Sequence, residues 1–300
     1  MLFDFDRPDF AKDGRNWPNR AASRFIDAGG ISWHVQEMGQ GPLMLLIHGT
    51  GGATHSWRDM LPLLAARFHV VAPDLPGHGF TSAIPDSQMS LPGLARAVGS
   101  LMRSGELSPA IIIGHSAGAA IAIRAALDGL LHPTSIVGVN AALRPFRGLA
   151  QHLFPVAARV LALNPLVPRL FSWQADTAGV RRLVSSTGSN IDDIGLDCYR
   201  RLISKSGHAA AALAMMANWD LDLLERDLPK LKTRLDLIVS TGDKAVPPDD
   251  ARLVQQRLPT TKIVTVPTLG HLAHEEDPKQ MTAIIEKIAV EAGILSAAQT

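Results

Sequence analysis

Short, mainly apolar runs alternate with helix-length segments along most of this 300-residue chain. Runs of this length, bounded by Gly, Pro and polar residues, are typical of buried strands. They are Leu43–Ile47, Val70–Pro73, Ala110–Ile113, Ser135–Asn140, Leu235–Ser240 and Lys262–Val266. Helical spacing is found in His55–Phe68, Leu91–Arg103, Ala117–Leu127, Asp249–Arg257 and Pro278–Ala292. The alternation predicts an α/β fold, in which helices cover both faces of a mainly parallel sheet. Ser23–Asp27 and Ile31–Met38, on either side of Gly29-Gly30, predict an additional hairpin.

The alternation is interrupted once. From Arg144 to Met215 the pattern is that of helices and loops, without a strand. We therefore expect a core made of residues 1–143 and 216–300, interrupted by a helical lid at residues 144–215. Ligands of open α/β sheets bind at the carboxyl ends of the strands. Because the insertion leaves from such an end, we expect it to cover the ligand site.

The strongest local motif is Gly114-His115-Ser116-Ala117-Gly118, which fits the pattern G-x-S-x-G. It lies between a predicted strand and a predicted helix, where a sharp turn exposes a nucleophilic serine above the sheet. The amino end of the helix also favours negative charge that develops at this point. We therefore expect Ser116 to be a catalytic nucleophile.

A serine hydroxyl is a weak nucleophile without a base, and this motif predicts the chain order Ser, acid, His. Asp243 follows the strand Leu235–Ser240, and His271 follows the strand Lys262–Val266. Both therefore belong at the same sheet edge as Ser116, with His271 as the base and Asp243 as the acid that orients it. His274 is the alternative base, but His271 stands directly after Gly270 at the strand exit.

Acyl transfer also needs hydrogen-bond donors for the oxyanion. The Gly-rich turn His48–Gly52 follows the strand Leu43–Ile47 and offers backbone N–H groups. We expect the amides of Thr50 and Ala117 to form the oxyanion hole.

Composition excludes several other classes. Lys plus Arg number 29 and Asp plus Glu 28, so no basic excess indicates a nucleic-acid partner. The N-terminal residues lack the pattern of a secretion signal, and no apolar run is long enough to cross a bilayer. With Cys198 as its single cysteine, the chain suits a reducing compartment, and we expect a cytoplasmic protein. No phosphate-binding loop and no zinc-ligand spacing occurs, so we expect neither a metal nor a cofactor.

Taken together, several motifs resemble the α/β-hydrolase superfamily. They are His48–Gly52, Asp74–Gly79, Gly114–Gly118, Gly242-Asp243 and Gly270–His274. The resemblance implies the α/β-hydrolase fold with a helical lid, and a Ser-His-Asp triad.

A second set of segments resembles the magnesium chelatase accessory proteins, which phototrophic bacteria encode together with bacteriochlorophyll biosynthesis. These segments are Trp17–Arg20, His48–Trp57, Gly114–Ala120, Asn164–Phe171 and Met215–Asp220. The resemblance implies a tetrapyrrole-related substrate and pathway proteins as candidate partners.

The predicted lid is rich in apolar side chains, and we expect Phe146, Phe154, Phe171 and Trp173 to contact an apolar substrate. The leading hypothesis is a serine esterase that acts on an ester or related acyl bond of such a substrate. Two alternatives remain: a non-catalytic accessory protein that binds a tetrapyrrole or a pathway enzyme, and a cofactor-free haloperoxidase-like enzyme. Epoxide hydrolases and haloalkane dehalogenases of this superfamily are disfavoured, because they carry aspartate where Ser116 stands.

Overall fold

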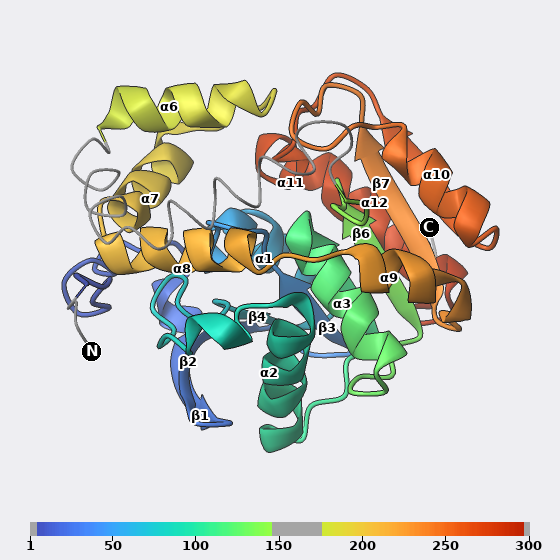
Figure 1. Cartoon of the computed structure of the whole chain (residues 1–300), viewed down its shortest axis with the longest axis horizontal. Helices are drawn as coiled ribbons and strands as arrows, with labels where there is room; N and C mark the ends of the chain where they lie inside the picture. The colour runs from blue at the N-terminus through green and yellow to red at the C-terminus, as the bar shows by residue number, and fades with distance from the viewer. Residues whose placement is uncertain (1–4, 146–175, 297–300) are drawn as a thin grey trace.

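The computed structural model describes residues 5–145 and 176–296 of the chain (Figure 1). Its strands are β1 Ser23–Ala28, β2 Ile31–Met38, β3 Leu43–Ile47, β4 His69–Pro73, β5 Ile111–His115, β6 Ser135–Val139, β7 Arg234–Ser240 and β8 Lys262–Val266. Its α-helices are α1 Met60–Leu64, α2 Leu91–Ser104, α3 Ala117–Leu127, α6 Thr177–Ser186, α7 Asp193–Ile203, α8 Ser206–Ala217, α9 Asp222–Asp227, α10 Asp250–Arg257, α11 Ala273–Glu276 and α12 Pro278–Glu291. Short 3-10 helices are η1 Arg20–Ala22, η2 Thr54–Trp57, η3 Asp86–Gln88 and η4 Leu228–Lys230.

The described strands form one eight-stranded sheet in the order β1-β2-β4-β3-β5-β6-β7-β8. From β4 to β8 every neighbouring pair is parallel, whereas β2 pairs antiparallel with both β1 and β4. The predicted hairpin is therefore present at one edge, and Gly29 and Gly30 turn it with positive φ angles of 62° and 76°. The mainly parallel sheet predicted from the sequence is confirmed.

Helices cover both faces of the sheet, as predicted. Along β3, Leu45 and Ile47 pack into the hydrophobic cluster that contains α2 and α3. Met44 and Leu46 alternate with them and pack into the cluster that contains α1 and α12. All four side chains are fully buried. A strand buried on both faces explains why its sequence is continuously apolar instead of alternating.

One predicted helix is shorter than expected. The segment predicted as a helix over His55–Phe68 divides into η2 and α1, which ends at Leu64. Pro62 has no N–H group to donate to the carbonyl four residues earlier, so a continuous helix through residue 58 is disfavoured.

Between β6 and β7 the chain leaves the sheet for a long excursion. Its described part, residues 140–145 and 176–233, contains α6, α7, α8, α9 and η4 and no strand. Figure 1 shows α6, α7 and α8 together on the left of the view, and α7 contacts both α6 and α8. The division into a core and a lid at residues 144–215 remains a prediction.

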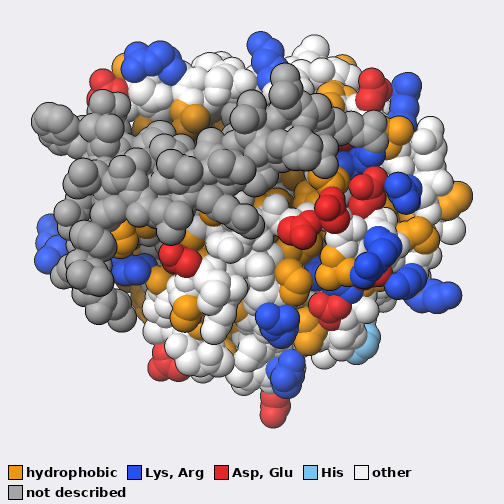
Figure 2. Space-filling view, in the orientation of Figure 1, with side chains coloured by type: hydrophobic (Ala, Val, Ile, Leu, Met, Phe, Trp, Pro, Cys, Tyr) orange, Lys and Arg blue, Asp and Glu red, His pale blue; other side chains and the backbone are white. Residues whose placement is uncertain are grey.

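Charges of both signs are mixed on the face shown in Figure 2, over the part of the surface that is described. This agrees with the formal net charge of +1. None of the described helices is both long and apolar enough to span a membrane.

Candidate active site

Ser116 lies in a strained turn between a strand and a helix. Strand β5 ends at His115 and α3 begins at Ala117, so Ser116 alone makes the connection. Its φ of 51° and ψ of −117° belong to a region that residues with a side chain rarely adopt. The Ser116 side chain does not cap α3, and the residue is partly exposed between two buried neighbours. The hydroxyl group is therefore not engaged by the end of the helix.

The two glycines of the motif let the turn pack closely. A Cβ atom on Gly114 would lie 2.4 Å from the backbone of Ala119, and one on Gly118 would lie 2.2 Å from the carbonyl oxygen of Ile47. Both distances are far below van der Waals contact. The spacing G-x-S-x-G is thus a packing requirement of the turn between β5, α3 and β3.

Asp243 and His271 are joined by a hydrogen bond. The distance from His271 Nδ1 to Asp243 Oδ2 is 2.8 Å, and both residues are buried. The other carboxylate oxygen of Asp243, Oδ1, accepts hydrogen bonds from the amides of Ala245 and Val246 at 2.8 and 2.9 Å. Donation by Nδ1 to the carboxylate leaves Nε2 of His271 as the ring nitrogen with the free lone pair.

Further contacts connect the loop of His271 to the serine turn. The ring nitrogen His115 Nε2 lies 3.0 Å from the carbonyl oxygen of His271, and the two rings lie 4.7 Å apart between centroids. Asn140 Nδ2 donates to the carbonyls of Gly270 and His271, each at 2.9 Å. Within the described residues no hydrogen bond joins the Ser116 hydroxyl to His271. Such bonds often form only when substrate is bound.

The Gly-rich loop after β3 lies against the serine turn. A Cβ atom on Gly49 would lie 3.0 Å from His115 Nδ1 and 3.1 Å from Ser116 Cβ. Gly51 has a positive φ of 77°, and the amide of Gly52 donates to the carbonyl of Gly49 at 3.1 Å, which closes a tight turn. Glycine at position 49 therefore allows this loop to approach Ser116.

Thr50 and Ala117, predicted to form the oxyanion hole, stand at the start of this loop and of α3. Within the described chain, no backbone or side-chain acceptor takes a hydrogen bond from either amide. The hydroxyl of Thr50 donates to Met215 Sδ on α8 at 3.4 Å. Among the residues that the structure describes, these two amides are thus available to donate to a ligand.

The side chain of His48 forms hydrogen bonds that hold the Gly49–Gly52 loop in place. The amide of Leu75 donates to Nε2 of His48 at 2.9 Å, which places the ring proton on Nδ1, and Nδ1 donates to the carbonyl of Gly49 at 2.7 Å. Burial lowers the pKa of His48. A neutral imidazole with both ring nitrogens hydrogen-bonded to the backbone has a structural role.

His274, the alternative base, packs against aromatic rings and has no carboxylate partner among the described residues. Its ring lies 4.4 Å from that of His115 and 4.6 Å from that of Trp57, between centroids, and burial lowers its pKa to about 3. Neither of its ring nitrogens has a hydrogen-bond partner in the described chain. The contact with a carboxylate therefore distinguishes His271 from His274.

His208 on α8 also reaches the site, and sequence reasoning missed it. Its Nδ1 accepts a hydrogen bond from the amide of Gly79 at 3.1 Å, and its Nε2 lies 3.1 Å from the carbonyl oxygen of Gly51. The helix is thereby tied to the Gly49–Gly52 loop. No motif marks His208, because both of its partners are backbone groups far away in the sequence.

The predicted substrate contacts Phe146, Phe154, Phe171 and Trp173 lie outside the described residues. They remain predictions.

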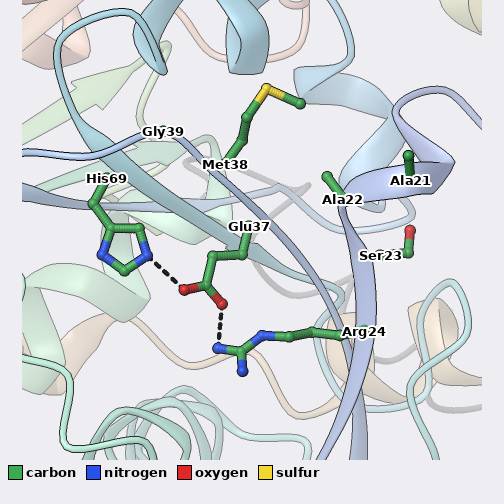
Figure 3. A pocket seen from close by; sticks show the side chains of 8 residues that line it. All are labelled: Ala21, Ala22, Ser23, Arg24, Glu37, Met38, Gly39 and His69. Carbon is green, nitrogen blue, oxygen red and sulfur yellow. Dashed lines mark hydrogen bonds and ion pairs between the residues drawn. The ribbon is translucent and has the colours of Figure 1, made fainter.

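A separate groove of about 430 Å³ lies beside β1 and β2, and Ser116 is not among its lining residues (Figure 3). Its lining residues are Ala21, Ala22, Ser23, Arg24, Glu37, Met38, Gly39 and His69. Glu37 is already paired there with Arg24 and with His69. The described residues contain no group of three or more His, Cys, Asp or Glu side chains suited to hold a metal ion.

Comparison with known proteins identifies relatives over most of the chain. A family model described as the alpha/beta hydrolase family matches residues 44–284. The magnesium-chelatase 30 kDa subunit of Rhodobacter capsulatus is 39% identical over 87% of this chain and 92% of its own length. A pimeloyl-(acyl-carrier protein) methyl ester esterase of Aeromonas hydrophila is 26% identical over 85% of this chain and 98% of its own length.

Solved structures share the fold. An alpha/beta hydrolase fold protein from Burkholderia ambifaria superimposes with a TM-score of 0.73 at 21% identity, covering 95% of this chain and 100% of the other. This chain belongs to the α/β-hydrolase family and resembles a magnesium chelatase subunit in sequence.

Proposed function

We propose that the protein is a serine hydrolase in which Ser116 is the nucleophile, His271 the general base and Asp243 the acid that orients it. One observation carries the proposal: His271, hydrogen-bonded to the buried Asp243, contacts through its carbonyl the ring of His115, the residue before a serine held in a strained strand-to-helix turn. The reaction is the cleavage of an ester or a related acyl bond.

The proposed mechanism uses the ring nitrogen of His271 that is not bonded to Asp243, and the two backbone amides proposed as the oxyanion hole. His271 donates its Nδ1 proton to Asp243, so Nε2 takes the proton of Ser116 as Oγ attacks the acyl carbon. The amides of Thr50 and Ala117 donate to the oxyanion of the tetrahedral intermediate. Protonated His271 then gives its proton to the leaving group, and water repeats the sequence to release the acid and regenerate Ser116.

We propose that the substrate is apolar and related to tetrapyrroles. The chelatase name of the relative from Rhodobacter capsulatus supports an association with the magnesium chelatase step of bacteriochlorophyll biosynthesis. The apolar composition of the proposed lid, residues 144–215, supports a substrate bound mainly by apolar burial, worth about 25 cal/mol per Å² removed from water. Long-chain esters are then expected to have a lower KM than short ones.

A fluorophosphonate probe tests the nucleophile. We expect the probe to label the wild type at Ser116 and to leave Ser116→Ala unlabelled. The matched control is Ser104→Ala, which alters an exposed serine at the end of α2 and should label normally. Hydrolysis of a series of p-nitrophenyl esters of increasing chain length tests the substrate class. A folded wild type that neither labels nor hydrolyses any of these esters would contradict the proposal.

The name of the same relative also favours a second candidate, a non-catalytic accessory protein that binds a tetrapyrrole. This function does not require the Ser116 hydroxyl. Protoporphyrin should then bind the wild type and Ser116→Ala with equal affinity, as measured by the quenching of tryptophan fluorescence during a titration. The fluorophosphonate probe should label neither protein.

A further inference from the structure

The turn that joins α6 to α7 contacts the acid loop and the base loop at the same time. The carbonyl oxygen of Thr187 accepts hydrogen bonds from the amide of Lys244 at 3.0 Å and from the amide of His271 at 3.3 Å. Lys244 directly follows Asp243 in the chain. A single carbonyl group of the insertion thus joins the backbones on either side of the Asp243–His271 hydrogen bond.

Three glycines bring these backbones together. Gly188 has a positive φ of 86°, and a Cβ atom on it would lie 2.1 Å from the carbonyl oxygen of Gly242. A Cβ atom on Gly270 would lie 2.4 Å from the carbonyl group of Gly188. The turn therefore lies wedged between the residue before Asp243 and the residue before His271, with no side chain between them.

Ser189 adds a side-chain contact to the base loop. Its Oγ accepts a hydrogen bond of 2.8 Å from the amide of Leu272, the residue after His271, and Ser189 is 2% exposed. Glu276 closes the contact from the other side, because its carboxylate accepts from the amides of Gly270 at 2.9 Å and Asn190 at 3.3 Å. The backbone of residues 270–272 is thus bonded to the turn or its carboxylate partner at each residue.

We propose that the segment Thr187–Ser189 is a positioning clamp, by which the helical insertion holds Asp243 and His271 in the geometry that turnover requires. Ser189 is the positioning residue whose side chain does this. The proposal rests on the proposed function for its kinetic consequence, although the hydrogen bond that it stabilises exists without substrate. The clamp gives the turn between α6 and α7 a role in holding the acid–base pair.

Replacing Ser189 by alanine tests the clamp. The substitution removes the acceptor of the Leu272 amide and leaves the backbone contacts in place. We expect kcat for an accepted ester to fall by about 10- to 100-fold, as displacements of catalytic groups by less than about 1 Å do, while KM changes by less than about twofold. Ser186→Ala is the matched control, because Ser186 is exposed at the end of α6, next to the turn, and its hydroxyl donates locally to the carbonyl of Leu183.

A second readout is independent of turnover. The proton in the Asp243–His271 hydrogen bond should give a far-downfield NMR resonance in the free wild type. We expect this resonance to shift or broaden in Ser189→Ala and to stay unchanged in Ser186→Ala. Gly188→Ala should have a larger effect, since its Cβ would meet the carbonyl of Gly242.

The outcomes separate the clamp from the proposed function. A perturbed resonance in Ser189→Ala together with an inactive wild type supports the clamp and contradicts the hydrolase. Normal kcat and a normal resonance in Ser189→Ala overturn the clamp, even if the variant is less stable to heat, because a merely structural role predicts only that loss. A wild type with neither activity nor the resonance overturns both.

Discussion

Acidification is expected to destabilise this protein through histidines that fold in the neutral form. His208 and His274 are each about 1% exposed, and burial lowers their pKa values from 6.5 to about 4 and about 3. The unfolded chain exposes both imidazoles and protonates them near pH 6.5. Between pH 6.5 and the folded pKa values, the unfolded state therefore binds more protons than the folded state. The stabilisation is complete above pH 6.5 and is lost as the pH falls.

The magnitude follows from the pKa values. At pH 5 the unfolded imidazole is 1.5 pH units below its pKa of 6.5, while the folded one is still mostly neutral. At about 1.36 kcal/mol per unit, each histidine then costs about 2 kcal/mol of unfolding free energy relative to pH 8. The two together cost about 4 kcal/mol, a large part of the stability of an ordinary domain, which is about 5–15 kcal/mol.

Urea unfolding followed by far-UV circular dichroism at pH 8 and pH 5 measures this loss. We expect His208→Gln to lose about 2 kcal/mol less than the wild type between the two pH values, since it has one buried imidazole fewer. His132→Gln alters an exposed histidine and should lose as much as the wild type. Equal pH dependence of His208→Gln and the wild type would refute the reasoning, because His208 would then not fold as the neutral form.

Two further predictions concern carboxylates. Asp243→Asn should keep the far-UV spectrum and lose turnover of an accepted ester by about 10⁴-fold, because the imidazole loses its charged partner; near-normal turnover would remove Asp243 from the acid role. Glu275→Ala removes the buried partner of Arg58 and should lower the free energy of unfolding, measured in urea, by about 3 kcal/mol. This value is at the low end for a broken buried ion pair, because Arg58 keeps its contacts with Asp192 and Asp59. A loss below about 1 kcal/mol would show that Arg58 needs no buried carboxylate.

The parts of the site that sequence predicts are those set by short-range rules. Ser116 is marked by its two glycines, whose close contacts with Ala119 and Ile47 require the smallest residue. Asp243 follows the buried strand β7 and His271 follows the edge strand β8, so the shared direction of these parallel strands places both residues at one end of the sheet. Each of these signals can be recognised from a short stretch of sequence around the residue.

What sequence did not predict depends on contacts between distant segments. The position of β4 between β2 and β3 is decided by strand pairing across the sheet, which no local pattern records. The contacts of His208 with Gly51 and Gly79 join groups more than 100 residues apart. The partners of the imidazole are the backbone carbonyl of Gly51 and the backbone amide of Gly79. The turn Thr187–Ser189 carries no hydrolase motif, yet it bonds the loops of Asp243 and His271.

Ser116 and His271, the proposed nucleophile and base, are made at different times during protein synthesis. Ser116 leaves the ribosome 271 − 116 = 155 residues before His271, and the strands that support the turn, β3, β5 and β6, are all complete by Val139. Because synthesis runs from the N-terminus, the sequence of the serine turn is complete well before His271 exists. A nascent or prematurely terminated chain that ends before β8 therefore presents the serine without its imidazole. Under the proposed function, such fragments are expected to lack esterase activity, which requires His271 to be synthesised and β8 to join the sheet.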